Sequence, residues 1–166
     1  MSEPATPVAK KRPEFRNINA FTDLPSYRLP VAGIVSILHR ISGAIMFVLM
    51  PFIIWMFDTS ISSEISFAKF TALFNIGTTF RWEYSGRFSS APILFSVGFP
   101  GWIFKLVALA LIWAYLHHSI AGLRHLWSDT HHSAVTKEFG KTSAAATLVL
   151  SIGLTLVLGA KLFGLY

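Results

Sequence analysis

The chain has 166 residues, of which 53% are apolar and only 13% are charged, with a net charge of +6. A soluble domain usually carries about twice this share of charged residues. Because the apolar residues also gather into long runs, the composition excludes an ordinary soluble domain and predicts an integral membrane protein. The chain has no cysteine, so it cannot itself supply a disulfide, an iron–sulfur cluster or a thioether haem linkage.

The N-terminal segment, residues 1–29, is basic and lacks the apolar core of a cleaved signal peptide. We therefore expect it to remain outside the membrane on the cytoplasmic side. The rest of the chain, 30–166, is expected to form one all-α membrane domain. Its spanning helices are predicted at about 30–57, 102–127 and 143–163, each at or above the roughly 20 residues needed to cross a bilayer.

Aromatic residues, a proline and two lysines characterise the ends and the continuity of these helices. Aromatic residues typical of membrane interfaces lie near the predicted ends: Tyr27, Trp55, Trp102, Trp127 and Tyr166. Pro51 is expected to bend the first helix without breaking it. Lys105 and Lys161 lie near the helix ends, where their long side chains can reach the interface, and we assign them no function.

The long connection at 58–101 is expected on the outer side. Within it, "SSEISFAKFTALF" has helical spacing and is predicted to lie along the membrane surface. Topology follows from the distribution of basic residues, which favours a cytoplasmic N-terminus and second connection. The basic residues that set this bias are Lys10, Lys11, Arg12, Arg16, Arg28, Arg124, Lys137 and Lys141. The same distribution explains the positive charge without nucleic-acid binding.

Polar residues occur at similar depth in the first two predicted helices. Ser36, Arg40 and Gly43 are spaced i, i+4, i+7, and so are His118, Gly122 and His125. At about 1.5 Å per residue, Arg40 lies roughly 15 Å and His118 roughly 13 Å from the cytoplasmic ends of their helices. A charge at the bilayer centre costs about 3 kcal/mol on insertion scales, so Arg40 is expected to face an anion, a polar cofactor or a wet cavity.

A histidine beside a glycine on a helix face is suited to haem, because the imidazole ligates iron and the missing side chain admits a flat macrocycle. Several simpler interpretations compete with this one. His118 can merely bond between helices, and periodicity does not choose between it and His117. Ser36 can bond back to its own helix, and Arg40 can pair with an acid on another subunit. The polar turn "HLWSDTHH" at 125–132 is interpreted as solvated rather than metal-binding.

These residues resemble a known family. "RP" at 12–13, "YRLPVAGIVSILHRISG" at 27–43 and "HSIAGLRHLWSD" at 118–129 are similar to the large cytochrome b anchor of succinate:quinone oxidoreductase, respiratory complex II. The motifs S-x-x-H-R-x-[ST]-G and H-x-x-x-G-x-R-H occur in the expected order, and a third helix follows. The resemblance covers most of 12–166. The region 58–101 looks longer than the family leads us to expect, and no role is transferred to it.

The resemblance implies specific roles for the site residues. His118 would be one axial ligand of a b-type haem, shared with a second small membrane-anchor subunit that supplies the other ligand. Ser36 and Arg40 would line the quinone site. His39 and Arg40 would lie near the haem propionates, with Gly122, Arg124 and His125 in the haem surroundings. Asp129 would form a polar link toward the iron–sulfur subunit.

The resemblance also implies partners: a flavoprotein that oxidises succinate and carries FAD, an iron–sulfur subunit that carries the clusters, and the second anchor, which completes a heterodimeric haem-binding bundle in membrane lipid. This chain would then have no succinate-oxidising residues. Ser36 can donate a hydrogen bond to a ubiquinone or menaquinone oxygen, and Arg40 can stabilise negative charge developing there. We expect a bacterial inner membrane rather than a mitochondrial one, because no transit peptide is evident.

Three other functions compete with this one. A quinol:fumarate reductase anchor would run the reaction in reverse. An anchor that has lost its haem would keep the fold, although His118 argues against this. A non-redox membrane transporter or assembly protein would be expected to have helices broken near the middle of the membrane.

Overall fold

The structure is a computed structural model that describes residues 19, 22–23, 29–84, 93–132 and 135–166. The N-terminal segment predicted at 1–29, with its basic residues and Tyr27, lies almost entirely outside the described residues. The described chain is mostly helical, as predicted, and three of its helices are long and apolar enough to cross a membrane: α1 (Val31–Val48), α4 (Gly101–Thr130) and α5 (Lys137–Leu162).

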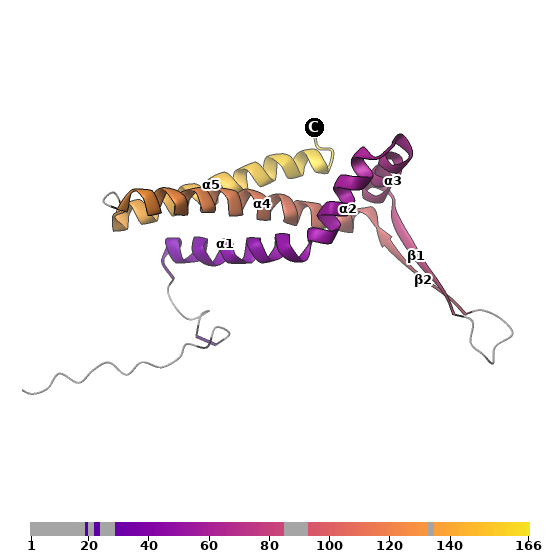
Figure 1. Cartoon of the computed structure of the whole chain (residues 1–166), viewed down its shortest axis with the longest axis horizontal. Helices are drawn as coiled ribbons and strands as arrows, with labels where there is room; N and C mark the ends of the chain where they lie inside the picture. Colours follow the sequence, from indigo (N-terminus) through magenta and orange to yellow (C-terminus); the bar gives the residue numbers. More distant parts are fainter. Residues whose placement is uncertain (1–18, 20–21, 24–28, 85–92, 133–134) are drawn as a thin grey trace, which may run out of the picture.

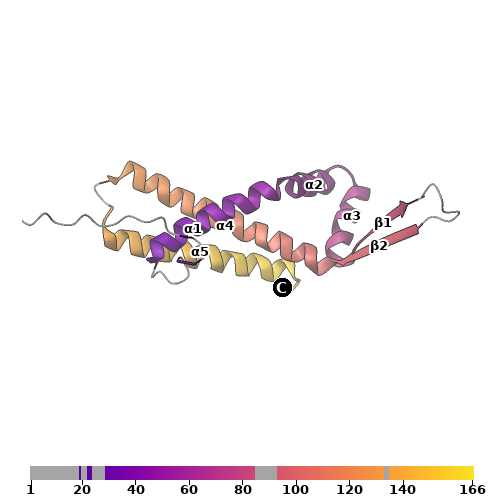
Figure 2. The ribbon, with the colours of Figure 1, turned by 90° about the horizontal axis from the view of Figure 1, so that it is seen from below.

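The three long helices lie side by side, with α4 packed along both α1 and α5 (Figures 1 and 2). Their shared core consists of Val35 from α1, Ala121 from α4 and Ala144 from α5, all fully buried. Small residues at such contacts let helix backbones approach closely, which is how helices associate when lipid surrounds them. The predicted second and third helices are confirmed, with α5 beginning six residues earlier than Ser143.

The prediction of one continuous helix over 30–57 is wrong. The helix breaks at Leu49, and α2 (Met50–Ile61) begins there with Pro51 in its first turn. Proline has no N–H to donate to the carbonyl of Phe47, and its ring crowds that carbonyl, so the α1 hydrogen-bond ladder cannot continue. As a result α2 turns away from the direction of α1 (Figure 1).

The connection predicted at 58–101 contains regular structure that lies at the end of the bundle. The helical spacing at 62–74 is confirmed by α3 (Glu64–Asn75), which starts with a capping box between Ser63 and Ser66. An antiparallel hairpin follows, β1 (Gly77–Tyr84) and β2 (Ile93–Pro100), and it was not predicted. It leaves the bundle where α3 meets α4 (Figure 1).

Two glycines fix the base of the hairpin. Gly77 has a φ of +103°, and a Cβ placed on it would lie 2.1 Å from the Phe99 carbonyl oxygen. A Cβ on Gly101 would lie 2.4 Å from the Phe74 carbonyl oxygen. Only glycine allows backbones to approach this closely. The hairpin is therefore anchored tightly between the end of α3 and the start of α4.

Candidate haem and quinone site

The two polar helix faces predicted at one depth do meet. The imidazole rings of His39 on α1 and His118 on α4 stack with centroids 4.2 Å apart and an angle of 18° between planes. His125, two turns further along α4, lies 5.3 Å from His39 by ring centroids. Both helices run unbroken through these residues, so a histidine cluster is built from two continuous helices.

The hydrogen bond of His118 determines which of its nitrogens is available. Nδ1 lies 3.1 Å from the carbonyl oxygen of His39. A carbonyl oxygen only accepts, so Nδ1 carries the proton and donates it. Nε2 is then the unprotonated nitrogen, the form in which imidazole ligates a metal. A backbone carbonyl that fixes the tautomer and ring orientation in this way is a common partner of a ligating histidine.

Ser42 and Gly43 complete the surroundings of His118, and the sequence analysis assigned neither of them a role at the ring. The fully buried Ser42 hydroxyl donates to the His39 carbonyl at 2.8 Å and lies 3.4 Å from His118 Nδ1. A Cβ on Gly43 would lie 3.1 Å from His118 Cε1, closer than a normal van der Waals contact. Gly43 thus makes room on α1 for the ring. The sequence signal for both residues was the motif S-x-x-H-R-x-[ST]-G, which contains Ser42 and Gly43.

His117, the alternative that periodicity left open, lies elsewhere. Its side chain is fully buried, Nδ1 is 3.1 Å from Ser151 Oγ on α5, and its ring stacks on Trp113. The Ser151 hydroxyl donates to the Leu148 carbonyl, so its oxygen accepts from His117. His117 Nε2 is buried without a hydrogen-bond partner among the described residues. This ring lies in the core of the bundle, and a macrocycle would have to part packed helices to reach it.

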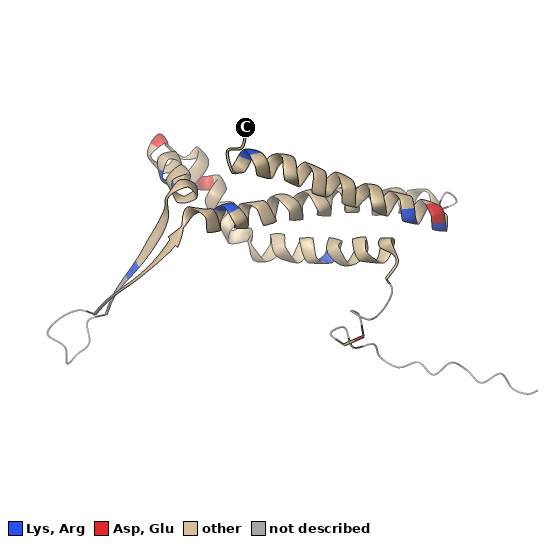
Figure 3. Ribbon diagram, turned by 180° about the vertical axis from the view of Figure 1, so that it is seen from behind, with Lys and Arg blue, Asp and Glu red and all other residues tan. Residues whose placement is uncertain are grey.

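Ser36 and Arg40 lie one turn apart on α1, before and beside the histidine cluster. The Arg40 side chain is exposed on the surface of this single chain. It has no hydrogen bond or ion pair to any other described residue. Figure 3 shows the contrast: the charged residues of the described part gather toward the ends of the helices and on the hairpin, whereas one basic position lies within α1. Ser36 is half-buried, and its hydroxyl makes no hydrogen bond to another described residue.

Of the remaining predicted site residues, Gly122 lies at the histidine cluster and Arg124 contacts α5. A Cβ on Gly122 would meet His39 Nε2 at 3.7 Å, so Gly122 lies against the histidine cluster with ordinary clearance. Arg124 points instead to α5, where Nε donates to Ser143 Oγ at 2.9 Å and a terminal nitrogen donates to the Gly140 carbonyl at 3.4 Å. The segment expected to form a polar turn at 125–132 is helical through Thr130, so Asp129 lies in the last turn of α4, with its side chain exposed. No group of metal-ligating side chains is found within the described ranges.

Comparison with known proteins identifies the family of this chain. The family model of the succinate dehydrogenase/fumarate reductase transmembrane subunit matches residues 10–158. The chain belongs to this family. It is also similar to two succinate dehydrogenase cytochrome b556 subunits: one from Paracoccus denitrificans, 27% identical over 137 residues (81% of this chain and 85% of the relative), and one from Coxiella burnetii, 30% identical over 129 residues (78% and 83%).

Membership establishes the coarse function. The chain is a membrane-anchor cytochrome b subunit of the succinate dehydrogenase/fumarate reductase family, and so part of an oxidoreductase complex with other subunits. The three apolar helices agree with a transmembrane subunit. The match extends over α1, α4 and most of α5, which are the elements that carry the histidine cluster and its supporting contacts.

Proposed function

We propose that this subunit supplies one axial ligand of a b-type haem through Nε2 of His118 and forms part of the quinone-reduction site of a succinate dehydrogenase. The observation that carries the proposal is the hydrogen bond from His118 Nδ1 to the His39 carbonyl, which leaves Nε2 unprotonated. The names of the two relatives, which contain cytochrome b556, support a b-type haem and the succinate-oxidising direction rather than fumarate reduction.

The donor chemistry of the site fits a haem. His118 provides a neutral imidazole nitrogen, Gly43 and Ser42 hold the ring, and His39 and Arg40 supply polar or cationic groups suited to propionates. A bound b-type haem supplies a one-electron carrier. The second axial ligand would come from the second small membrane-anchor subunit, with Gly122 and His125 in the haem surroundings on this side, whereas Arg124 bonds to α5.

For quinone reduction, the residues of α1 supply a donor and a cation. The Ser36 hydroxyl donates a hydrogen bond to a quinone oxygen, and Arg40 one turn later stabilises the negative charge that develops on it. Arg40 is suited to this because it has no ion-pair partner in the described part of the chain. Ubiquinone and menaquinone both offer such an oxygen. Electrons must come from a partner subunit, since a chain without cysteine holds no iron–sulfur cluster.

The same proposal includes partners and location. A flavoprotein with FAD and an iron–sulfur subunit would dock at the membrane face nearest the histidine cluster, and this chain would carry no succinate-oxidising residue. We place it in a bacterial inner membrane with the N-terminus cytoplasmic. The rival transporter function expected helices broken at mid-membrane, whereas α1 and α4 are continuous through Arg40 and His118.

The first test is His118→Ala in the assembled complex. We expect haem to be lost or strongly reduced, with succinate oxidation by a soluble dye largely retained, because that reaction does not need this chain. The measurement is the dithionite-reduced minus oxidised spectrum of the purified complex. His117→Gln is the matched control and should keep the haem. If haem content stays unchanged in His118→Ala, the assignment of the ligand is wrong.

The second test is Arg40→Leu, with Arg40→Lys as the variant that keeps the charge. Quinone reductase activity should fall by at least about tenfold in Arg40→Leu, because oxyanion-type stabilisation is removed. Dye reductase activity should hardly change, and Arg40→Lys should recover part of the loss. Equal losses in both assays would mean that Arg40 supports assembly rather than quinone reduction.

A further inference from the structure

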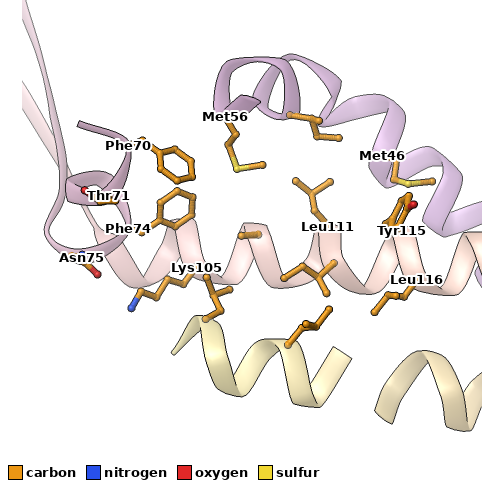
Figure 4. A pocket seen from close by; sticks show the side chains of 15 residues that line it. Met46, Met56, Phe70, Thr71, Phe74, Asn75, Lys105, Leu111, Tyr115 and Leu116 are labelled. Atoms are coloured by element: carbon orange, nitrogen blue, oxygen red, sulfur yellow. The ribbon is translucent and has the colours of Figure 1, made fainter. Parts of the chain in front are cut away.

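A cavity lies beside α4, and residues of α2, which begins after the break at Leu49, line part of it. After the break, α2 packs mainly against α3, while α4 stays packed against α1 and α5. The space left beside α4 is a cavity of about 680 Å³. Figure 4 shows it lying along α4, with α2 and α3 on one side and α5 on the other. This volume lies in the range of ligand-binding pockets in proteins.

The cavity has a largely apolar body, with Tyr115 toward one end and a cation at the other (Figure 4). Its body is lined by aliphatic, methionine and aromatic side chains such as Met56, Phe70 and Leu111. Its end near the start of α4 carries Asn75 and Lys105 (Figure 4). The Lys105 ammonium lies 5.7 Å from the Phe163 ring centroid and makes no ion pair with a described carboxylate. An unpaired cation at the mouth of an apolar cavity complements an anionic head group on a hydrocarbon chain.

The length of the cavity matches one leaflet of a bilayer. Along α4 its lining runs from Lys105 near the helix start to Leu116. Eleven residues at about 1.5 Å each give roughly 16 Å, about half of the roughly 30 Å hydrocarbon core. A phospholipid acyl chain extends over the same depth, from the interface to the bilayer centre. Lys105 lies at the interfacial end, where a lipid phosphate would be.

We propose that this cavity binds one acyl chain of an anionic phospholipid, with the phosphate held by Lys105. The site is separate from the proposed quinone site, because none of its lining residues is Ser36, Arg40 or a histidine. A bound chain would fill the space that the divergence of α2 leaves, and so would support α2 and α3 against α4. Lys105 then binds lipid rather than merely extending to the interface.

The experiment is native mass spectrometry of the whole purified complex in mild detergent with equal amounts of phosphatidylglycerol and phosphatidylcholine. The wild type should retain one phosphatidylglycerol at this site. Lys105→Gln should lower the ratio of retained phosphatidylglycerol to phosphatidylcholine by about fivefold, the effect of one basic residue near an anionic lipid. Ala108→Trp, which fills the cavity, should abolish the retained lipid.

Leu106→Trp is the matched control, since Leu106 is 46% exposed on the same helix and does not line the cavity. It should keep the lipid, and dye reductase activity should confirm assembly of each variant. Retention unchanged in both Lys105→Gln and Ala108→Trp would overturn the proposal. If the molecule that Ala108→Trp loses has the mass of a quinone rather than of a phospholipid, the proposal is overturned too. If Ala108→Trp fails to assemble, the lipid ratio in Lys105→Gln decides alone.

Discussion

At the scale of single residues, His117 and His118 show how neighbouring side chains of one type acquire different surroundings. Both lie on α4, but a step of one residue turns a side chain by about 100° around a helix. His117 is therefore enclosed against α5 with Ser151 as its partner, while His118 meets α1 and bonds to the His39 carbonyl. Both rings use Nδ1 in these contacts, but His117 Nε2 is buried inside the bundle, whereas the His118 side chain is only partly buried.

The space that Gly43 leaves for the His118 ring can be tested by substitution. We expect Gly43→Ala to displace the His118 ring, because the new Cβ would lie 3.1 Å from Cε1 and 3.3 Å from Nδ1. Haem content should fall at least severalfold, or the haem should show an altered visible spectrum. Gly153→Ala on α5 is the control, because a Cβ there meets nothing within 4 Å. A normal spectrum in Gly43→Ala would show that the ring is not held by this contact.

At the scale of elements, polar contacts reinforce helix pairs whose cores are small. Arg124 near the end of α4 bonds to Ser143 and to the Gly140 carbonyl near the start of α5. These bonds join the two helices close to the turn that connects them. The guanidinium was expected in the haem surroundings, and the contacts described here are instead to α5. Its position near the helix end also lets this charge stay close to the interface.

We predict that Ser143→Ala destabilises the α4–α5 pair by about 0.6 kcal/mol, the average for hydrogen bonds between membrane helices. Thermal inactivation of the solubilised complex should occur at a lower temperature. Thr142→Ala is the control, because Thr142 is exposed and its hydroxyl bonds only within α5. Equal stability of the two variants would mean that Arg124 finds another acceptor at no cost.

At the scale of the whole molecule, the three spanning helices place the two connections at opposite ends of the bundle. The turn between α4 and α5 lies at one end, and α3 with the hairpin lies at the other (Figures 1 and 2). The distribution of basic residues favours the α4–α5 turn on the cytoplasmic side. The histidine cluster would then lie in the cytoplasmic half of the membrane, close to the subunits that deliver electrons.

This topology is testable because the chain has no cysteine of its own. Thr136→Cys, before α5, should react with a membrane-impermeant maleimide only from the cytoplasmic side of oriented vesicles. Ser62→Cys, between α2 and α3, should react only from the opposite side. Both residues are exposed, so burial would not prevent the reaction. The reverse pattern would invert the proposed orientation.

Much of this architecture is determined by local sequence. Long apolar runs specify spanning helices because backbone groups in lipid must be bonded within the helix. Helical periodicity also placed His118 and Arg40 at one depth, because rise per residue is fixed. The helical spacing at 62–74 similarly predicted α3, which begins with a capping box at Ser63. The alternation of aromatic residues in "TFRWEY" was a signal for β1, but it lay in a connection without a recognised pattern.

Tertiary structure decided what periodicity leaves open. Apolar composition continues through residue 57, so hydropathy does not distinguish a bent helix from a broken one. Pro51 cannot bond to the Phe47 carbonyl, and both a bent and a broken helix can accommodate that loss. After the break, α2 packs on α3, and residues of both helices line the cavity beside α4. Which face of α4 meets α1 was likewise settled by contacts between helices, and those contacts assign His118 to α1 and His117 to α5.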